Sequence, residues 1–128
     1  MIVLDTHAAV WWTQSPERLG TKAKKAIGSA DLLLIPAIVL WEVALLVRKE
    51  RLALKGGRSV QDWAAEVLSI PRVREVPLSS DLALRADALE MHADPADRFI
   101  AAATLHAEAS LVTKDKLLAA LRWLPTVW

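Results

Sequence analysis

Apolar and polar residues follow one another in blocks that predict strands alternating with helices. Short apolar runs predict buried strands at residues 2–4, 32–35, 73–76 and 110–113, and a final strand at 124–128. Helical periodicity and capping residues predict helices over 6–13, 22–27, 36–50, 59–68, 79–91 and 94–107, and a short one after Asp115. Within this pattern Pro36 suits the first position of its helix.

This alternation predicts the α/β class, with a central parallel sheet of four to five strands. Helices are expected on both faces of the sheet, because parallel strands are joined by right-handed crossovers. In such sheets ligands bind at the carboxyl ends of the strands. Asp5 and Asp115 follow predicted strands, so both are expected at that edge.

The length of 128 residues predicts a single domain, residues 1–128. Lys55-Gly56-Gly57-Arg58 predicts a loop inside it. Apolar residues make up 54% of the chain, which is rich for a small domain. We therefore expect some apolar surface to be covered by a second copy of the chain or by another partner.

The chain has no cysteine, which excludes disulfides and thiolate metal sites. The longest apolar run, 32–47, is interrupted by Pro36 and Glu42 and is short for a membrane span. The first residues lack the basic region of a signal peptide. These features predict a cytoplasmic protein without a membrane association. The net charge of +1 is too small to attract nucleic acid by itself.

Glu42 lies in an apolar helical segment, and no rotation of that helix gives it a polar face. A buried lone carboxylate costs several kcal/mol unless it is paired, protonated or bound to a cation. The sequence leaves open whether Glu42 is a cation ligand or is hydrogen-bonded to an arginine or a backbone amide.

Three further acids have both a structural and a functional interpretation. Asp5 and Asp115 are good helix N-caps. Asp94 precedes Pro95 and is expected to cap the next helix, whereas Asp97 lies one turn later above an apolar stripe. One shared cation explains Asp5, Glu42, Asp97 and Asp115 together. Oxygen ligands without histidine or cysteine favour Mg²⁺ or Mn²⁺, and such ions support phosphodiester hydrolysis. Four such carboxylates in one pocket are expected to raise one another's pKa.

Basic residues next to the acids are candidates for contacts with phosphate, namely Arg98, Lys114 and Lys116. The basic segment 48–58 fits a solvated helix end better. His7, His92 and His106 are unpaired by spacing and are expected in packing or surface roles. The tryptophans are not interleaved with basic residues, so core or interface packing is favoured over base stacking.

These residues form four ordered motifs that resemble the PIN-domain ribonucleases, specifically the VapC-type toxins of toxin–antitoxin pairs. The motifs are Ile2-Val3-Leu4-Asp5-Thr6-His7-Ala8, Trp41-Glu42-Val43, Asp94-Pro95-Ala96-Asp97-Arg98-Phe99-Ile100-Ala101 and Leu111-Val112-Thr113-Lys114-Asp115. The closing Leu124-Pro125-Thr126-Val127-Trp128 is familiar in one branch of the family. The likeness covers the whole chain with order and spacing kept.

The resemblance implies a three-layer α/β/α sandwich and a Mg²⁺ or Mn²⁺ endoribonuclease site at Asp5, Glu42, Asp97 and Asp115. It implies that Thr6 and Thr113 support these acids. It further implies an RNA substrate, a homodimer, and inhibition by a cognate VapB-like antitoxin. One departure is that Lys116-Leu117-Leu118 follows Asp115, where the family commonly has Asp-x-x-Phe.

Other functions remain open on the residues alone. Asp5-Thr6-His7 lacks the Asp-x-Asp of aspartyl phosphatases, and no acidic pair typical of a phosphoreceiver is present. A non-catalytic binding module with the PIN fold is the remaining alternative. The RNA target, the antitoxin and the number of metal ions are not encoded in any motif.

Overall fold

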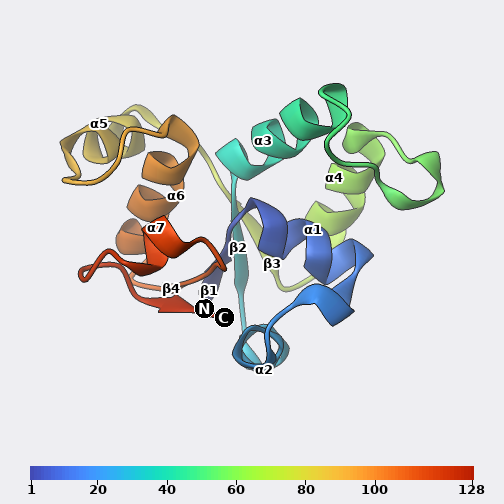
Figure 1. The fold of residues 1–128 in the computed structure, drawn as a ribbon, viewed down its shortest axis with the longest axis horizontal. Coiled ribbons are helices and arrows are strands. Elements are labelled where there is room, and N and C mark those ends of the chain that lie inside the picture. Colours follow the sequence, from blue (N-terminus) through green and yellow to red (C-terminus); the bar gives the residue numbers. More distant parts are fainter.

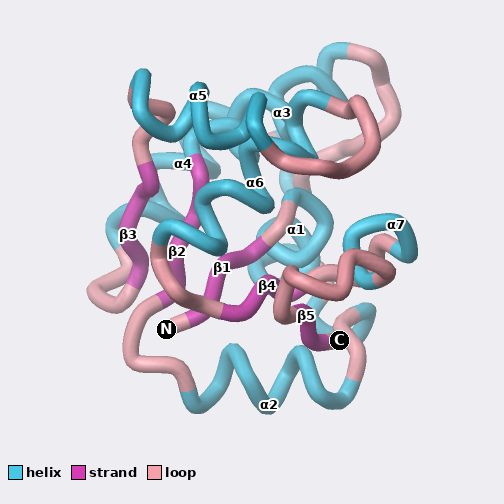
Figure 2. The backbone as a smooth tube through the Cα atoms, turned by 90° about the vertical axis from the view of Figure 1, so that its left-hand side faces the viewer, coloured by secondary structure: helices cyan, strands magenta, loops and turns pink.

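The computed structural model describes residues 1–128 and contains one parallel sheet of five strands in the order β3-β2-β1-β4-β5. The strands are β1 (Ile2–Leu4), β2 (Leu33–Pro36), β3 (Val73–Val76), β4 (Ser110–Val112) and β5 (Thr126–Val127). Figure 2 shows them side by side, with β1 at the centre of the sheet. The predicted parallel sheet is confirmed, including the short strand at the end of the chain.

Helices cover both faces of this sheet (Figure 1). One side carries α1 (Thr6–Gln14), α2 (Thr21–Ser29), α3 (Ala37–Arg48) and α4 (Val60–Ser69). The other side carries α5 (Ser80–Ala88), α6 (Pro95–His106) and α7 (Lys116–Ala119). The result is the predicted three-layer α/β/α sandwich.

The core consists of the strands and the helix faces that pack on them. β1, β2 and most of β4 are buried, which explains their continuous apolar sequence. Trp63 of α4 is 1% exposed, and its indole Nε1 donates to the hydroxyl of Thr13 at 2.9 Å. This hydrogen bond satisfies the one polar atom of a large core residue.

Two short 3₁₀ turns complete the chain, η1 (Pro16–Arg18) and η2 (Lys55–Gly57). The predicted loop at 55–58 contains η2. Gly56 and Gly57 have φ angles of 72° and 66°, a left-handed conformation that glycine adopts without strain.

One prediction about α3 was wrong in detail. Pro36 is not the first helical residue but the last residue of β2 and the N-cap of α3, with an extended ψ of 138°. The helix is also less buried than its apolar sequence suggests, since only Val39 and Val43 are buried. Trp41 is 54% exposed, which leaves interface packing as the remaining one of the two roles predicted for it.

The order of the strands places a topological switch point between β1 and β4. The chain runs from β1 outward to β3 on one side, and returns to β4 and β5 on the other. A crevice forms at the carboxyl ends of the strands at such a point. No helix in this fold is long and apolar enough to span a bilayer.

Candidate functional site

The site is centred on the carboxyl ends of β1 and β4. These strands pair in parallel with Leu4 opposite Val112, and the Asp5 N–H donates to the Val112 carbonyl at 3.2 Å. The residues that follow the two strands therefore lie next to each other. They include Asp5 and Thr6 after β1, and Thr113 after β4.

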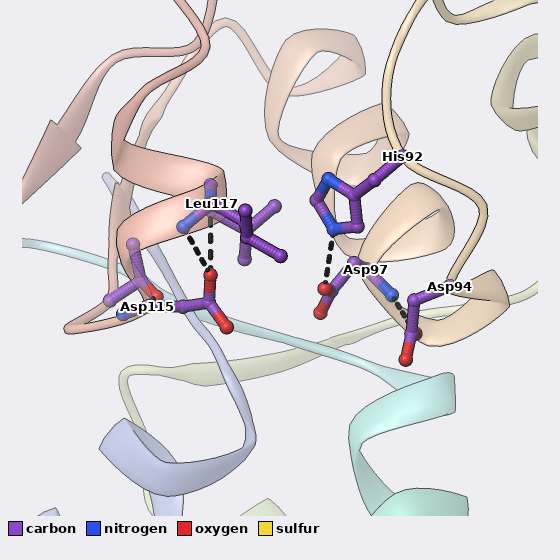
Figure 3. A network of polar contacts seen from close by, with 7 residues as sticks. His92, Asp94, Asp97, Asp115 and Leu117 are labelled. Carbon is purple, nitrogen blue, oxygen red and sulfur yellow. Dashed lines mark hydrogen bonds and ion pairs between the residues drawn. The ribbon is translucent and has the colours of Figure 1, made fainter.

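Asp5 and Asp115 both cap helices and both line the same cleft. Asp5 accepts the Ala8 N–H at 2.9 Å, while Asp115 Oδ1 accepts the N–H groups of Leu117 and Leu118 at 2.8 and 3.0 Å (Figure 3). Asp5 and Asp115 can therefore cap their helices and line the site at the same time. The cap hydrogen bonds fix each side chain at the rim.

Thr113 connects these two acids. Its hydroxyl accepts the Asp115 N–H at 3.0 Å, and its side chain is close enough to the Asp5 carboxyl to lower the pKa of Asp5. Thr113 is 2% exposed, so these contacts are made inside the protein.

Glu42 reaches the cleft from α3. It is half-buried, and it accepts a hydrogen bond from the Thr6 hydroxyl at the start of α1. This contact joins residues that lie 36 positions apart in the sequence. Glu42 is therefore directed towards Asp5 and its neighbours, and it is not paired with an arginine.

Asp97 enters the cleft from the first turn of α6. Its backbone N–H donates to Asp94 Oδ1 at 3.0 Å, which confirms Asp94 as the cap of this helix. Its carboxylate Oδ2 lies 2.7 Å from Nε2 of His92. In Figure 3 the Asp97 and Asp115 side chains point towards the space between α6 and α7.

Together these residues enclose an open cleft of about 600 Å³. Its lining comprises Asp5, Thr6, His7, Trp11, Glu42, Leu46, Asp94, Asp97, Ile100, Lys114, Asp115 and Lys116. This lining contains five carboxylates and two lysines, so the cleft is strongly acidic. No three acidic or imidazole side chains stand together as a ready-made metal cluster.

Burial is the main influence on the acids. It raises the pKa of Asp5 from 3.8 to about 6, against hydrogen bonds with Thr113 and Ala8 that lower it. Burial likewise raises the pKa of Glu42 and the pKa of Asp97, with repulsion between the acids adding to each. The predicted direction is confirmed for Asp5, Glu42 and Asp97, but desolvation rather than mutual repulsion is the larger cause.

A basic and aromatic wall borders the acids on the side of α1 and α7. Lys114 Nζ lies 5.0 Å from the ring centre of Trp11, and the Arg18 guanidinium lies 4.5 Å from it. Trp11 is 7% exposed and also contacts the rings of His7 and Trp128. Lys114 is thus held at the cleft by a cation–π contact.

Arg98 does not line the cleft. Its guanidinium donates to the carbonyls of Leu89 and Ala86 at the end of α5. The sequence suggested a phosphate contact because Arg98 follows Asp97. However, consecutive helical residues point in directions about 100° apart, and Arg98 turns away from the cleft.

Sequence reasoning missed five residues of this cleft: His7, Trp11, Leu46, Asp94 and Ile100. It also missed the pairing of His92 with Asp97. Their separation of five positions did not predict a contact, because the segment between them is a loop that ends where the helix starts. Asp94 was expected only as a cap.

A family model described as PIN domain matches residues 2–124. Ribonuclease VapC22 of Mycobacterium tuberculosis is 38% identical over 119 residues, which are 91% of this chain and 88% of that protein. The chain therefore belongs to the PIN-domain family and is related to its VapC-type ribonucleases. Ribonucleases of this kind generally depend on divalent metal ions.

Solved structures share the fold at lower sequence identity. A structure of VapBC2 from Rickettsia felis, bound to a promoter DNA fragment, matches with a TM-score of 0.70 and 20% identity, and the match covers 99% of this chain and 98% of that one. A toxin–antitoxin complex from Klebsiella pneumoniae matches with a TM-score of 0.69 and 20% identity, covering 100% and 97%.

Proposed function

We propose that this protein hydrolyses RNA phosphodiester bonds with a divalent cation, Mg²⁺ or Mn²⁺, held by Asp5, Glu42, Asp97 and Asp115. The observation that carries the proposal is the convergence of these acids. They come from four separate segments and line one cleft at the switch point of the sheet. The relationship to Ribonuclease VapC22 supports RNA as the substrate.

The residues of the cleft fit a hard divalent cation. All of the proposed ligands are carboxylates, and no cysteine is present in the chain. Such ligands favour Mg²⁺ or Mn²⁺ over Zn²⁺. Burial makes each of Asp5, Glu42 and Asp97 costly as an isolated anion, and a bound cation removes that cost.

The negative charge of the cleft means that a polyanion such as RNA can bind there only together with a cation. Five carboxylates would repel a phosphate, and two lysines do not balance them. A divalent ion would supply the positive charge that attracts and orients the phosphate and would activate water for its hydrolysis.

The remaining residues of the cleft have supporting roles in this proposal. The Thr6 hydroxyl holds the Glu42 carboxylate, and the Thr113 hydroxyl accepts the backbone N–H of Asp115 beside Asp5. Lys114 and Lys116 flank Asp115 in the lining of the cleft and are the proposed contacts to the phosphate backbone of the substrate.

We further propose that the protein acts in the cytoplasm as the toxin of a toxin–antitoxin pair, with a VapB-like antitoxin as its partner. The support is the likeness to VapBC2 and to the toxin–antitoxin complex described above. Exposed apolar side chains such as Trp41 and Leu84, 54% and 74% exposed, offer surface for a partner. The homodimer expected from the apolar composition stays a prediction.

The test is cleavage of a labelled single-stranded RNA by the purified protein. We expect cleavage with Mg²⁺ or Mn²⁺, loss of cleavage with EDTA, and recovery when Mn²⁺ is restored. D97N protein, purified in parallel, controls for contaminating nucleases. Cleavage that survives EDTA would overturn the metal assignment. If the wild type does not cleave while D97N behaves identically, the chain is a non-catalytic binding module.

A further inference from the structure

His92 is the one histidine whose side chain contacts a proposed metal ligand directly. It lies in the loop between α5 and α6, and its Nε2 is 2.7 Å from Oδ2 of Asp97 (Figure 3). The two side chains are only 23% and 19% exposed. The pair is thus largely shielded from solvent, where a hydrogen bond orients its partners more firmly than at the surface.

Asp97 is held at two points by this loop. Asp94 Oδ1 accepts its backbone N–H, and His92 contacts one oxygen of its carboxylate. The second carboxylate oxygen, Oδ1, takes part in neither contact. The arrangement therefore fixes the rotation of the carboxylate and leaves one oxygen for a ligand in the cleft.

The loop that carries His92 is itself anchored to α6. The Arg98 guanidinium donates to the Leu89 carbonyl at 2.7 and 3.0 Å and to the Ala86 carbonyl at 3.4 Å. Arg98 follows Asp97 directly in the sequence. The start of α6 thus provides both the proposed metal ligand and the anchor of the loop that orients it.

We propose that His92 is a positioning residue for the metal site, which donates a hydrogen bond from Nε2 to Asp97 and presents the free carboxylate oxygen to the cation. The inference rests on the proposed function. Carboxylates that bind metals are commonly oriented by such partners, and loss of the partner weakens metal affinity roughly 10–100-fold.

Calorimetric titration of the metal-free protein with Mn²⁺ tests this role without measuring activity. H92F keeps the size of a ring but has no donor, whereas H92Q places an amide N–H at a reach similar to that of Nε2. We expect H92F to bind Mn²⁺ roughly 10–100-fold more weakly than wild type and H92Q to recover most of the affinity. H106A, on the exposed end of α6, is the matched control and should bind like wild type.

Melting of the metal-free proteins separates positioning from folding, because a positioning residue should change Mn²⁺ affinity with little change in melting temperature. If H92F does not fold, H92A serves as the variant without a donor. Equal affinity in wild type and the donor-free variant would overturn the role of His92 and leave the proposed function intact. Equal loss in the donor-free variant and H92Q would also overturn the hydrogen-bond explanation. A wild type that does not bind Mn²⁺ would overturn the proposed function itself.

Discussion

Helices α3 and α6 both have 12 residues and each brings one acid to the cleft, yet they are packed very differently. In α6 six residues are buried, four of them alanines in the run from Ala96 to Thr104. In α3 only two residues are buried, although its sequence is the more apolar of the two. Apolar composition therefore does not by itself tell which helix enters the core.

The difference follows from the size of the side chains and from the position of each helix. Small alanines let α6 approach the sheet closely, and α6 contacts β1, β2 and β4. In α3 the outer side presents large residues such as Trp41, which is 54% exposed. We infer that α6 is a rigid support for Asp97, and that α3 supports Glu42 while offering surface to a partner.

The largest predicted effect is on catalysis, where losing the acid of α3 or the acid of α6 should be equally damaging. E42Q and D97N each remove one charge, and we expect each to lower RNA cleavage at least about 100-fold, as the loss of an electrostatic catalytic group does. D94N is the matched control on α6. Asparagine caps helices as well as aspartate, so most activity should remain. Equal loss in D94N and D97N, with both proteins folded, would show that the two acids are wrongly distinguished.

The second prediction concerns Asp5, which follows β1 and caps α1. Its folded pKa of about 6 is above the ordinary 3.8, so the folded protein binds this proton more tightly than the unfolded chain. The charged carboxylate therefore destabilises the metal-free fold above pH 6, and the penalty disappears as pH falls towards 3.8. At pH 7 it amounts to about 3 kcal/mol, at 1.36 kcal/mol per pKa unit.

Melting curves in EDTA at pH 5 and pH 7 measure this penalty. We expect D5N to melt several degrees higher than wild type at pH 7 and to keep roughly half of that difference at pH 5, because the folded pKa of Asp5 is about 6 and the ordinary value is 3.8. Burial also raises the pKa of Glu42 and the pKa of Asp97, so D5N should keep some pH dependence. A lower melting temperature for D5N at pH 7 would mean that Asp5 stabilises the fold as a charged cap.

A third prediction tests the packing of the two helices with the same substitution. Ala101 in α6 is completely buried, whereas Ala44 in α3 is half-buried. A101L should destabilise the fold by about 1–3 kcal/mol through overpacking, and A44L should change it by less than about 0.5 kcal/mol. Urea denaturation measures both. Similar losses in the two variants would contradict the distinction between a core helix and a surface-forming helix.

The last prediction is a small effect on stability for W41A. Its exposed indole contributes little to the fold, so we expect a loss of less than about 1 kcal/mol. Association should respond more clearly if α3 is an interface, since buried tryptophans often anchor interfaces. Light scattering at matched concentrations and binding of the cognate antitoxin provide the readouts. A W41A protein that associates as wild type does would exclude this surface.

The sequence predicted the sheet well because its signals are local. Buried parallel strands such as Ile2–Leu4 are continuous apolar runs, and each is followed by a recognisable helix start. That the four acids line one cleft was also predictable, because each stands at a strand end or in an apolar segment where an isolated charge is costly.

What the sequence did not predict depends on contacts between distant residues. The resemblance implied that Thr6 supports the acids, but not that its partner is Glu42, 36 positions away in the sequence. The half-exposure of α3 depends on what the rest of the chain leaves uncovered. Arg98 is a residue that the sequence wrongly placed in the site. Its neighbour Asp97 enters the cleft, but the helical rotation turns Arg98 towards the carbonyls of Leu89 and Ala86.

The most direct test of the site is a crystal of this protein soaked with Mn²⁺ and examined by anomalous diffraction. The proposal predicts an anomalous peak in the cleft, bonded to carboxylate oxygens of Asp5 and Asp97, with Glu42 and Asp115 beside it. The same peak should be weak or absent in D97N crystals. A peak elsewhere on the surface, or no peak in the cleft of a protein that still cleaves RNA, would contradict a metal site formed by these four acids.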